Sequence, residues 1–141
     1  MFISETDIEV RYAETDQMGI VYYANYFTWF DIGRTKLVKD LGFRYTEMEK
    51  DGYLAPVLDA QANFKKSVLY GGYAKVRIWI EEYDGIKTVY GYEILDEQGN
   101  ICVTGSSSHI LVKKGSFRPV AMKKVFPDWH EIYEKERKVQ A

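Results

Sequence analysis

The spacing of apolar side chains predicts one long helix in the first third of the chain. Large side chains recur at steps of three and four from residue 23 to residue 41: Tyr23, Phe27, Phe30, Arg34, Leu37 and Leu41. This spacing is typical of one face of an amphipathic helix, and Gly42 stands where glycine commonly ends a helix. We therefore predict a helix over Ala24–Leu41, about 27 Å long at ~1.5 Å per residue.

One interior position of this helix is glycine. Gly33 falls on the same side as Tyr26, Phe30 and Leu37. Glycine inside a helix costs about 1 kcal/mol of stability relative to alanine. Because a sheet that packs closely against the helix backbone would require a glycine, we predict such a close approach at Gly33.

Alternation of apolar and polar positions predicts five strands in the rest of the chain. They cover Glu5–Tyr12, Ala55–Lys65, Tyr73–Tyr83, Lys87–Asp96 and Ile101–Val112. Turn residues at 84–85 and 97–100 join the last three strands into a meander. Shorter helical segments are predicted near Thr46–Glu49 and from Pro127 onward.

The same alternation divides the side chains of each predicted strand between two faces. In the first predicted strand, one side carries Thr6, Ile8, Val10 and Tyr12. In the second, one side carries Leu58, Ala60, Ala62 and Phe64. In the third, the inward side carries Val76, Ile78 and Ile80.

Element lengths indicate how helix and strands combine. Several predicted strands would span roughly 30 Å at ~3.3 Å per residue, which matches the predicted helix. One antiparallel sheet could therefore curl round one helix along its whole length, an α+β arrangement. We predict a single domain over residues 1–141, with a core at about 3–125 and a helical tail at 127–141.

Composition supports a compact domain and narrows its partners. The chain has 141 residues and 16.5 kDa, is 46% apolar and 16% aromatic, and carries a net charge of −2. This balance gives no general attraction to nucleic acid. The single cysteine, Cys102, cannot form an internal disulfide, and no window approaches the ~18 apolar residues of a membrane span. We expect a cytoplasmic protein with no nucleic-acid partner.

The loop before the predicted helix holds the candidate chemistry. Asp16 and Gly19 lie in this loop, a few residues before the helix begins. A helix N-terminus offers unpaired backbone N–H groups and partial positive charge, which suit a developing oxyanion. A carboxylate next to such donors is what hydrolysis of an activated acyl group needs.

The segment Arg11–Phe27 resembles the motif of the 4-hydroxybenzoyl-CoA thioesterase family of hotdog-fold acyl-CoA thioesterases. The shared elements are Asp16, Gly19, the Ile20-Val21-Tyr22 step and the Asn25-Tyr26 pair, and the strand pattern extends the similarity to most of residues 3–125. The resemblance implies a long central helix wrapped by a curved antiparallel sheet, an active site between paired subunits, and coenzyme A thioesters as substrates. It also implies that Asp16 is the catalytic carboxylate and that the backbone N–H of Tyr23 is the oxyanion donor.

At position 23 the chain departs from some bacterial members of the family, which carry histidine where this sequence has Tyr23. A backbone donor does not depend on its side chain, so the implied role of the Tyr23 N–H stands. The departure bears instead on which substrate is used.

Further residues are candidates for contact with the substrate: Gly19, Val21, Tyr22, Asn25 and Arg118. Asn25 could equally cap the helix, and Gly19 could serve a turn. Arg118, with Lys65 and Lys66, suits the phosphates of coenzyme A. Neither His109 nor His130 has metal-ligand companions at suitable spacing, so we expect no metal and no cofactor.

The sequence leaves three functions open. The first is a homodimeric or homotetrameric acyl-CoA thioesterase in which Asp16 is either the nucleophile or the general base. The second is a hydratase or dehydratase that acts on acyl thioesters with the same fold. The third is a non-catalytic module that binds acyl-CoA or a protein through its aromatic surface.

Overall fold

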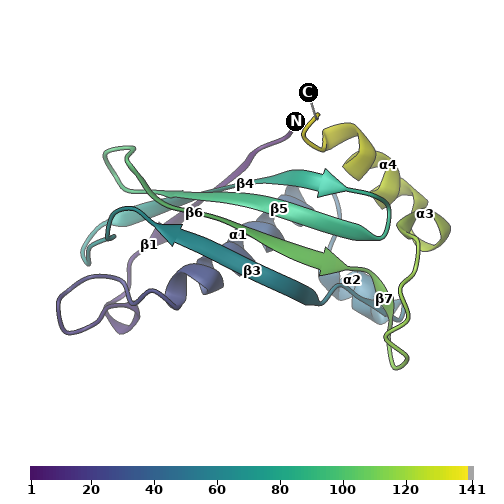
Figure 1. The fold of residues 1–141 in the computed structure, drawn as a ribbon, viewed down its shortest axis with the longest axis horizontal. Coiled ribbons are helices and arrows are strands. Elements are labelled where there is room, and N and C mark those ends of the chain that lie inside the picture. The colour runs from purple at the N-terminus through teal and green to yellow at the C-terminus, as the bar shows by residue number, and fades with distance from the viewer. Residues whose placement is uncertain (140–141) are drawn as a thin grey trace.

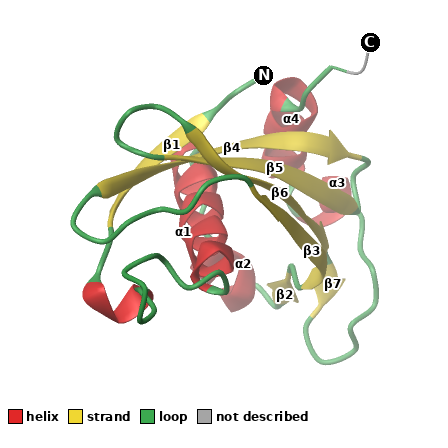
Figure 2. Cartoon of the chain, turned by 60° about the vertical axis from the view of Figure 1, so that its left-hand side comes forward, coloured by secondary structure: helices red, strands yellow, loops and turns green. Residues whose placement is uncertain are grey.

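The computed structural model describes residues 1–139. A five-stranded antiparallel sheet curls round one long helix, α1 (Asn25–Asp40), which lies on the concave side of the sheet (Figures 1 and 2). Its strands, in spatial order, are β1 (Ser4–Glu9), β4 (Tyr73–Tyr83), β5 (Lys87–Leu95), β6 (Ile101–Ile110) and β3 (Val57–Phe64). The predicted α+β architecture is therefore confirmed.

The predicted meander is present, and its strands nearly match their predicted ranges. Strand β4 has the predicted bounds, β5 ends one residue early and β6 ends two residues early. Val76, Ile78 and Ile80 are at most 1% exposed, which confirms the predicted inward side of β4. Long antiparallel strands with one covered face give the strongest period-two pattern, so this part of the fold was the most predictable.

The first strand is shorter than predicted, and the prediction for Tyr12 was wrong. The chain leaves the sheet after Val10, whose N–H donates to the carbonyl of Gly72, and then forms a short 3-10 turn, η1 (Tyr12–Glu14). Tyr12 lies in that turn with 76% of its surface exposed. Val10 and Tyr12 continue the apolar alternation beyond Glu9, where β1 ends.

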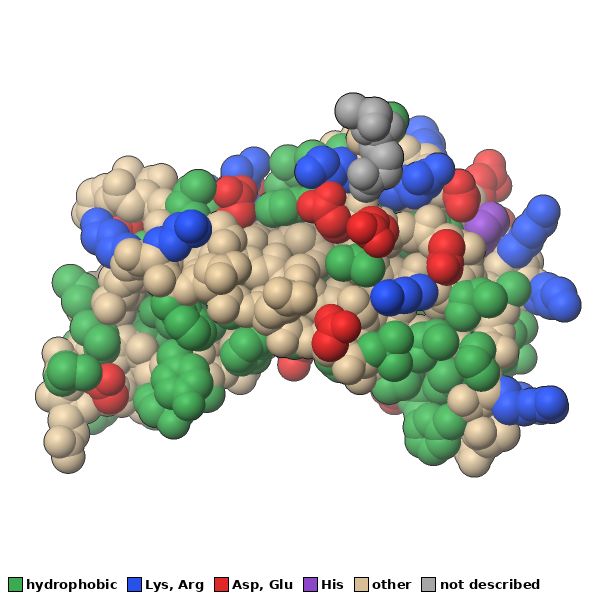
Figure 3. All heavy atoms as spheres, in the orientation of Figure 1, with side chains coloured by type: hydrophobic (Ala, Val, Ile, Leu, Met, Phe, Trp, Pro, Cys, Tyr) green, Lys and Arg blue, Asp and Glu red, His purple; other side chains and the backbone are tan. Residues whose placement is uncertain are grey.

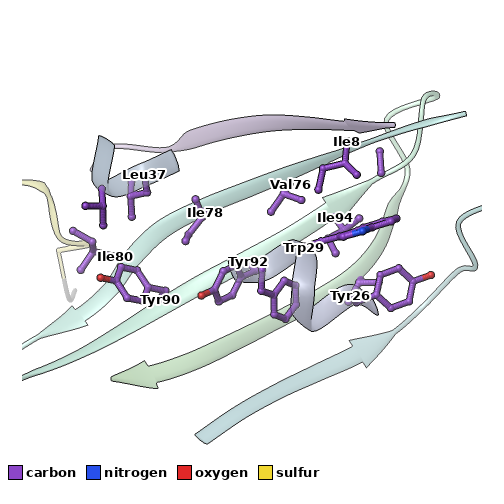
Figure 4. Packing of buried hydrophobic residues seen from close by; sticks show 14 of the residues in the cluster. Ile8, Tyr26, Trp29, Leu37, Val76, Ile78, Ile80, Tyr90, Tyr92 and Ile94 are labelled. Carbon is purple, nitrogen blue, oxygen red and sulfur yellow. The ribbon is translucent and has the colours of Figure 1, made fainter. Parts of the chain in front are cut away.

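Helix α1 packs closely on the sheet at Gly33, as predicted. A Cβ at Gly33 would lie 2.8 Å from Cγ1 of the buried Val76, closer than real Cβ contacts come. The face that is fully buried comprises Tyr26, Trp29, Phe30, Gly33, Leu37 and Val38, and Figure 4 shows several of these side chains between the helix and the strands. The predicted face ran through Tyr23 and Arg34. The buried face is turned about the helix axis from the predicted one, and it contains Gly33.

Shorter elements close the end of the sheet away from the loop before α1. They are α2 (Tyr45–Lys50), β2 (Tyr53–Leu54) paired with β7 (Val112–Lys113), α3 (Met122–Val125) and α4 (Pro127–Glu136). The predicted helical segments near Thr46 and from Pro127 are confirmed, and Trp129 of α4 stacks on Phe43 with ring centroids 4.8 Å apart. Residues 140–141 of the predicted tail lie outside the described residues. No helix in the described part of the chain is long and apolar enough to cross a membrane.

Strand β3 forms one edge of the sheet. It starts two residues later and ends one residue earlier than predicted, and it pairs with β6 on one side only. Every residue of β3 except Ala62 is exposed. On the apolar side predicted for this strand, Phe64 is 53% exposed although its ring lies 5.7 Å from that of Tyr26 on α1.

Candidate active site

The loop that carries Asp16 is closed by its own backbone. The N–H of Asp16 donates to the carbonyl of Ile20 over 2.9 Å, and the N–H of Gly19 donates back to the carbonyl of Asp16 over 3.1 Å. Gly19 has a φ of 77°, a left-handed conformation that glycine adopts without strain, so it serves this turn. The loop is thus a defined turn.

The Asp16 carboxylate is held by one of its oxygens. Oδ1 accepts a hydrogen bond of 2.8 Å from the N–H of Met18. Among the residues that the structure describes, Oδ2 has no hydrogen-bond partner. Asp16 is half-buried. One oxygen therefore fixes the rotamer while the other is available to a reactant.

A segment far along the chain lies against this loop. The N–H of Val21 donates to the carbonyl of Val68, and the N–H of Tyr70 donates to the carbonyl of Gly19. The phenol oxygen of Tyr26 accepts a hydrogen bond of 3.3 Å from the N–H of Val68. The end of β3 and residues 65–70, which follow it, are thereby brought beside the loop that carries Asp16 (Figure 1).

The two segments enclose a pocket of about 600 Å³. It is lined by Asp16, Met18, Ile20, Val21, Tyr22, Tyr23, Tyr26, Phe64, Lys65, Lys66 and Ser67. Of the residues predicted from the sequence, the pocket brings together Asp16, Val21, Tyr22 and Tyr23, with the two lysines. Met18, Ile20 and Tyr26 belong to the same short segment as Asp16 but were not predicted as site residues. Phe64 and Ser67 were missed because they lie about 50 positions from Asp16 in the sequence.

The walls of this pocket are aromatic and its rim is basic. The Tyr23 and Phe64 rings meet edge to face at 6.0 Å, and the Tyr26 and Phe64 rings lie 5.7 Å apart. Lys66 forms an ion pair of 3.1 Å with Asp96. Figure 3 shows hydrophobic and basic side chains gathered at this end of the molecule. Burial raises the pKa of the Tyr26 phenol, which therefore stays protonated at neutral pH.

Two adjacent backbone donors lie where α1 begins. The next three N–H groups are used in tight turns: Asn25 donates to Tyr22, Tyr26 to Tyr23, and Phe27 to Ala24. Within the described part of the chain, the N–H groups of Tyr23 and Ala24 have no acceptor. Both residues are exposed. The Tyr23 N–H was predicted as a donor; the Ala24 N–H beside it was not.

A second hollow of similar volume, over β1, β4 and β5, lacks these features. Several of its charged side chains form ion pairs: Lys75 with Glu5 at 3.2 Å, and Arg77 with Glu93 at 3.0 Å. It contains no helix N-terminus and no predicted site residue. We therefore place the candidate site at the pocket beside Asp16.

Three residues predicted to contact substrate, Gly19, Asn25 and Arg118, are not among the residues that line this pocket. Asn25 donates from Nδ2 to the carbonyl of Glu14 over 2.9 Å. Arg118 is exposed in the loop that follows β7, at the opposite end of the molecule's long axis (Figure 1). Their roles in substrate binding stay predictions. Within residues 1–139 no group of three or more potential metal ligands is found.

Comparisons with known proteins identify the family. The model of the thioesterase-like superfamily matches residues 10–130. The chain belongs to this superfamily. This membership confirms the prediction of a thioester hydrolase, and the predicted hotdog fold is confirmed by the structural match described next.

Three proteins that are similar to this chain in sequence or structure can be compared with it by identity and coverage. A candidate acyl-CoA thioesterase of Bacillus subtilis (strain 168), YneP, is 56% identical over 138 residues, which cover 98% of this chain and 100% of that protein. A crystal structure of the DHNA-CoA thioesterase of Staphylococcus aureus has a TM-score of 0.93 and 47% identity, covering 96% of this chain and 91% of that one. A 1,4-dihydroxy-2-naphthoyl-CoA hydrolase of Thermosynechococcus vestitus is 23% identical over 85% of this chain and 83% of that protein.

Proposed function

We propose that this thioesterase hydrolyses an acyl-CoA at the pocket beside Asp16, releasing the free acid and coenzyme A. The observation that carries the proposal is that one aromatic pocket is lined by both Asp16 and Tyr23. Among residues 1–139, one Asp16 carboxylate oxygen has no hydrogen-bond partner, and the N–H groups of Tyr23 and of the adjacent Ala24 have no acceptor. A thioester is an activated acyl group whose thiolate leaves readily. A base or nucleophile with oxyanion donors therefore suffices for its hydrolysis.

The roles of the residues follow from that pairing. The thioester carbonyl oxygen accepts hydrogen bonds from the N–H of Tyr23, helped by that of Ala24, and these bonds strengthen as negative charge develops on it. Asp16 either takes a proton from the attacking water or attacks the carbonyl carbon itself, forming an anhydride that water then cleaves. In both routes the C–S bond breaks and the departing thiolate takes up a proton.

The aromatic walls of the pocket favour the binding of a planar acyl group, and the lysines at the rim of the pocket favour the binding of coenzyme A. Val21, Tyr22 and the neighbouring aromatic rings offer flat apolar surface to an aryl or alkyl chain. Lys65 and Lys66 suit the phosphates of coenzyme A. Because two of the relatives are named for a dihydroxynaphthoyl thioester, we propose an aromatic acyl-CoA as the substrate class.

Thiol release measured across a panel of acyl-CoAs tests this function. The panel should contain 1,4-dihydroxy-2-naphthoyl-CoA, benzoyl-CoA and short, long and branched acyl-CoAs, with a thiol-reactive dye as the readout. We expect the highest kcat/KM for an aromatic member. Hydration of an enoyl-CoA without thiol release would favour a hydratase instead, and tight binding with no turnover across the panel would favour a binding module.

We also propose that the chain associates with itself as a homodimer or homotetramer. The outer edge of β3 has no partner strand among residues 1–139, and an exposed edge of eight residues is a ready template for pairing. Light scattering on the purified protein should give at least twice the 16.5 kDa of one chain. A mass of one chain at micromolar concentration would contradict association. The cytoplasmic location stays a prediction, which cell fractionation would test.

A further inference from the structure

A buried acid lies two residues before Asp16. Glu14 is 4% exposed and does not line the pocket. Its Oε2 accepts a hydrogen bond of 2.7 Å from Nε1 of Trp29, and its Oε1 accepts one of 2.9 Å from the N–H of Arg11. The Arg11 guanidinium lies 3.3 Å from Oε2. A buried carboxylate is costly unless it is satisfied in this way.

The backbone of the same residue holds the turn before α1. The carbonyl oxygen of Glu14 accepts one hydrogen bond of 2.8 Å from the N–H of Tyr22 and another of 2.9 Å from Nδ2 of Asn25. Tyr22 and Asn25 flank Tyr23 and Ala24, whose N–H groups have no acceptor in the described part of the chain. Glu14 therefore adjoins the Asp16 loop in the chain, and its carbonyl holds the two residues on either side of the Tyr23 and Ala24 N–H groups.

Trp29 gives this arrangement a rigid support. It is 0% exposed in the core face of α1, and its ring meets that of Tyr26 edge to face at 5.4 Å. Tyr26 in turn lines the pocket and contacts the segment after β3 through Val68. The Glu14 carboxylate therefore connects the Asp16 loop to a side chain that the core holds in one position.

The charge on Glu14 is stabilised in the fold. Burial by itself raises the pKa of this carboxyl, but the hydrogen bonds from Trp29 and Arg11 outweigh that effect, so the pKa is lowered. The group is an ionised acceptor at neutral pH. An apolar side chain could fill the same space, but it could not accept these hydrogen bonds.

We propose that Glu14 is a positioning residue for the hydrolytic site. Through Trp29, Arg11 and its own carbonyl it fixes the Asp16 carboxylate relative to the free N–H groups of Tyr23 and Ala24. The inference rests on the proposed function. It assigns Glu14 no contact with the substrate, because the residue lies outside the pocket.

The test is the Glu14→Gln variant, in which an amide replaces one acceptor oxygen and directs its hydrogens at either Trp29 Nε1 or the Arg11 N–H. A displacement of about 1 Å can cost up to about 100-fold in rate, so we expect kcat to fall by about 10- to 100-fold. KM should change by less than about two-fold, because substrate contacts remain. The matched control is Glu9→Gln, which makes the same chemical change at an exposed position of β1 and should leave kcat unchanged.

A double-variant cycle with Trp29→Phe separates positioning from general stability. Because both single changes break the same hydrogen bond, the double variant should lose much less than the product of the two single losses in kcat. Circular dichroism and a melting curve establish that each variant is folded at the assay temperature. Should Glu14→Gln fail to fold, Glu14→Asp, which keeps the charge on a shorter side chain, should fold and show an intermediate kcat.

Two outcomes would overturn the inference. One is a folded Glu14→Gln protein with a lowered melting temperature and a wild-type kcat, since the residue would then be structural only. The other is a double variant of Glu14→Gln and Trp29→Phe whose loss in kcat equals the product of the two single losses. Absence of thiol release from the wild-type protein is a separate result, which rejects the proposed function itself.

Discussion

The Asp16→Asn variant should lose about 100-fold or more in kcat for acyl-CoA hydrolysis. Asparagine retains an oxygen that can accept the hydrogen bond from the Met18 N–H, so the loop should keep its shape. It cannot take up a proton at neutral pH or form an anhydride. The loss should therefore fall on kcat, measured by thiol release under saturating substrate, while KM changes little.

The matched control is Asp7→Asn, at an exposed position of β1 outside the pocket, which should retain wild-type kcat. An Asp16→Asn protein that turns over at the wild-type rate would reject the role of Asp16. Quenched single turnovers analysed by mass spectrometry then separate the two routes. An acyl group found on the Asp16 peptide supports direct attack, whereas full turnover with no adduct supports a general base.

Folding stability should fall steeply between about pH 6.5 and pH 4, with His109 as a main cause. Burial, and then the positive charge of Arg34, lower the pKa of His109 from 6.5 to about 4. Its Nε2 lies 2.8 Å from the Ser107 hydroxyl, and the ring is 3% exposed. The unfolded chain takes up a proton near pH 6.5 while the folded protein does not until about pH 4, so stability is fully present above pH 6.5 and lost on acidification.

The size of this effect follows from the shift, at about 1.4 kcal/mol per pH unit. We expect on the order of 3 kcal/mol of unfolding free energy to disappear across the window, measured by urea denaturation at a series of pH values. In His109→Gln the slope between pH 6.5 and 4 should shrink, because glutamine does not titrate in this range. Equal slopes in wild type and His109→Gln would exclude this cause.

The sequence predicted best where structure depends on local periodicity. Strand β4 and helix α1 each bury one face along their whole length, so their period of two or of 3.6 is strong. Gly33 was interpretable for a related reason, since a glycine in a helix interior needs a packing explanation. The two-residue strands β2 and β7 were missed because they are too short to show any period.

The candidate site was predictable in part. The Asp16 carboxylate and the Tyr23 N–H belong to one short motif, so their proximity follows from chain connectivity. Phe64 and the lysines next to it reach the pocket only because residues 68–70 pair with the loop at residues 19–21. The sequence of residues 64–70 contains no pattern that predicts this pairing.

By itself, then, the sequence determined the helix, the meander and the acid that precedes the helix, because each of these depends on neighbours within a few residues. Tertiary structure alone decided that Glu14 is buried against Trp29, that the Ala24 N–H has no acceptor among residues 1–139, and that Arg118 lies at the far end of the molecule. The physical reason is that burial and hydrogen-bond satisfaction are set by contacts between segments distant in the chain. An acidic residue two positions before another looks the same in a sequence whether it is solvated or enclosed.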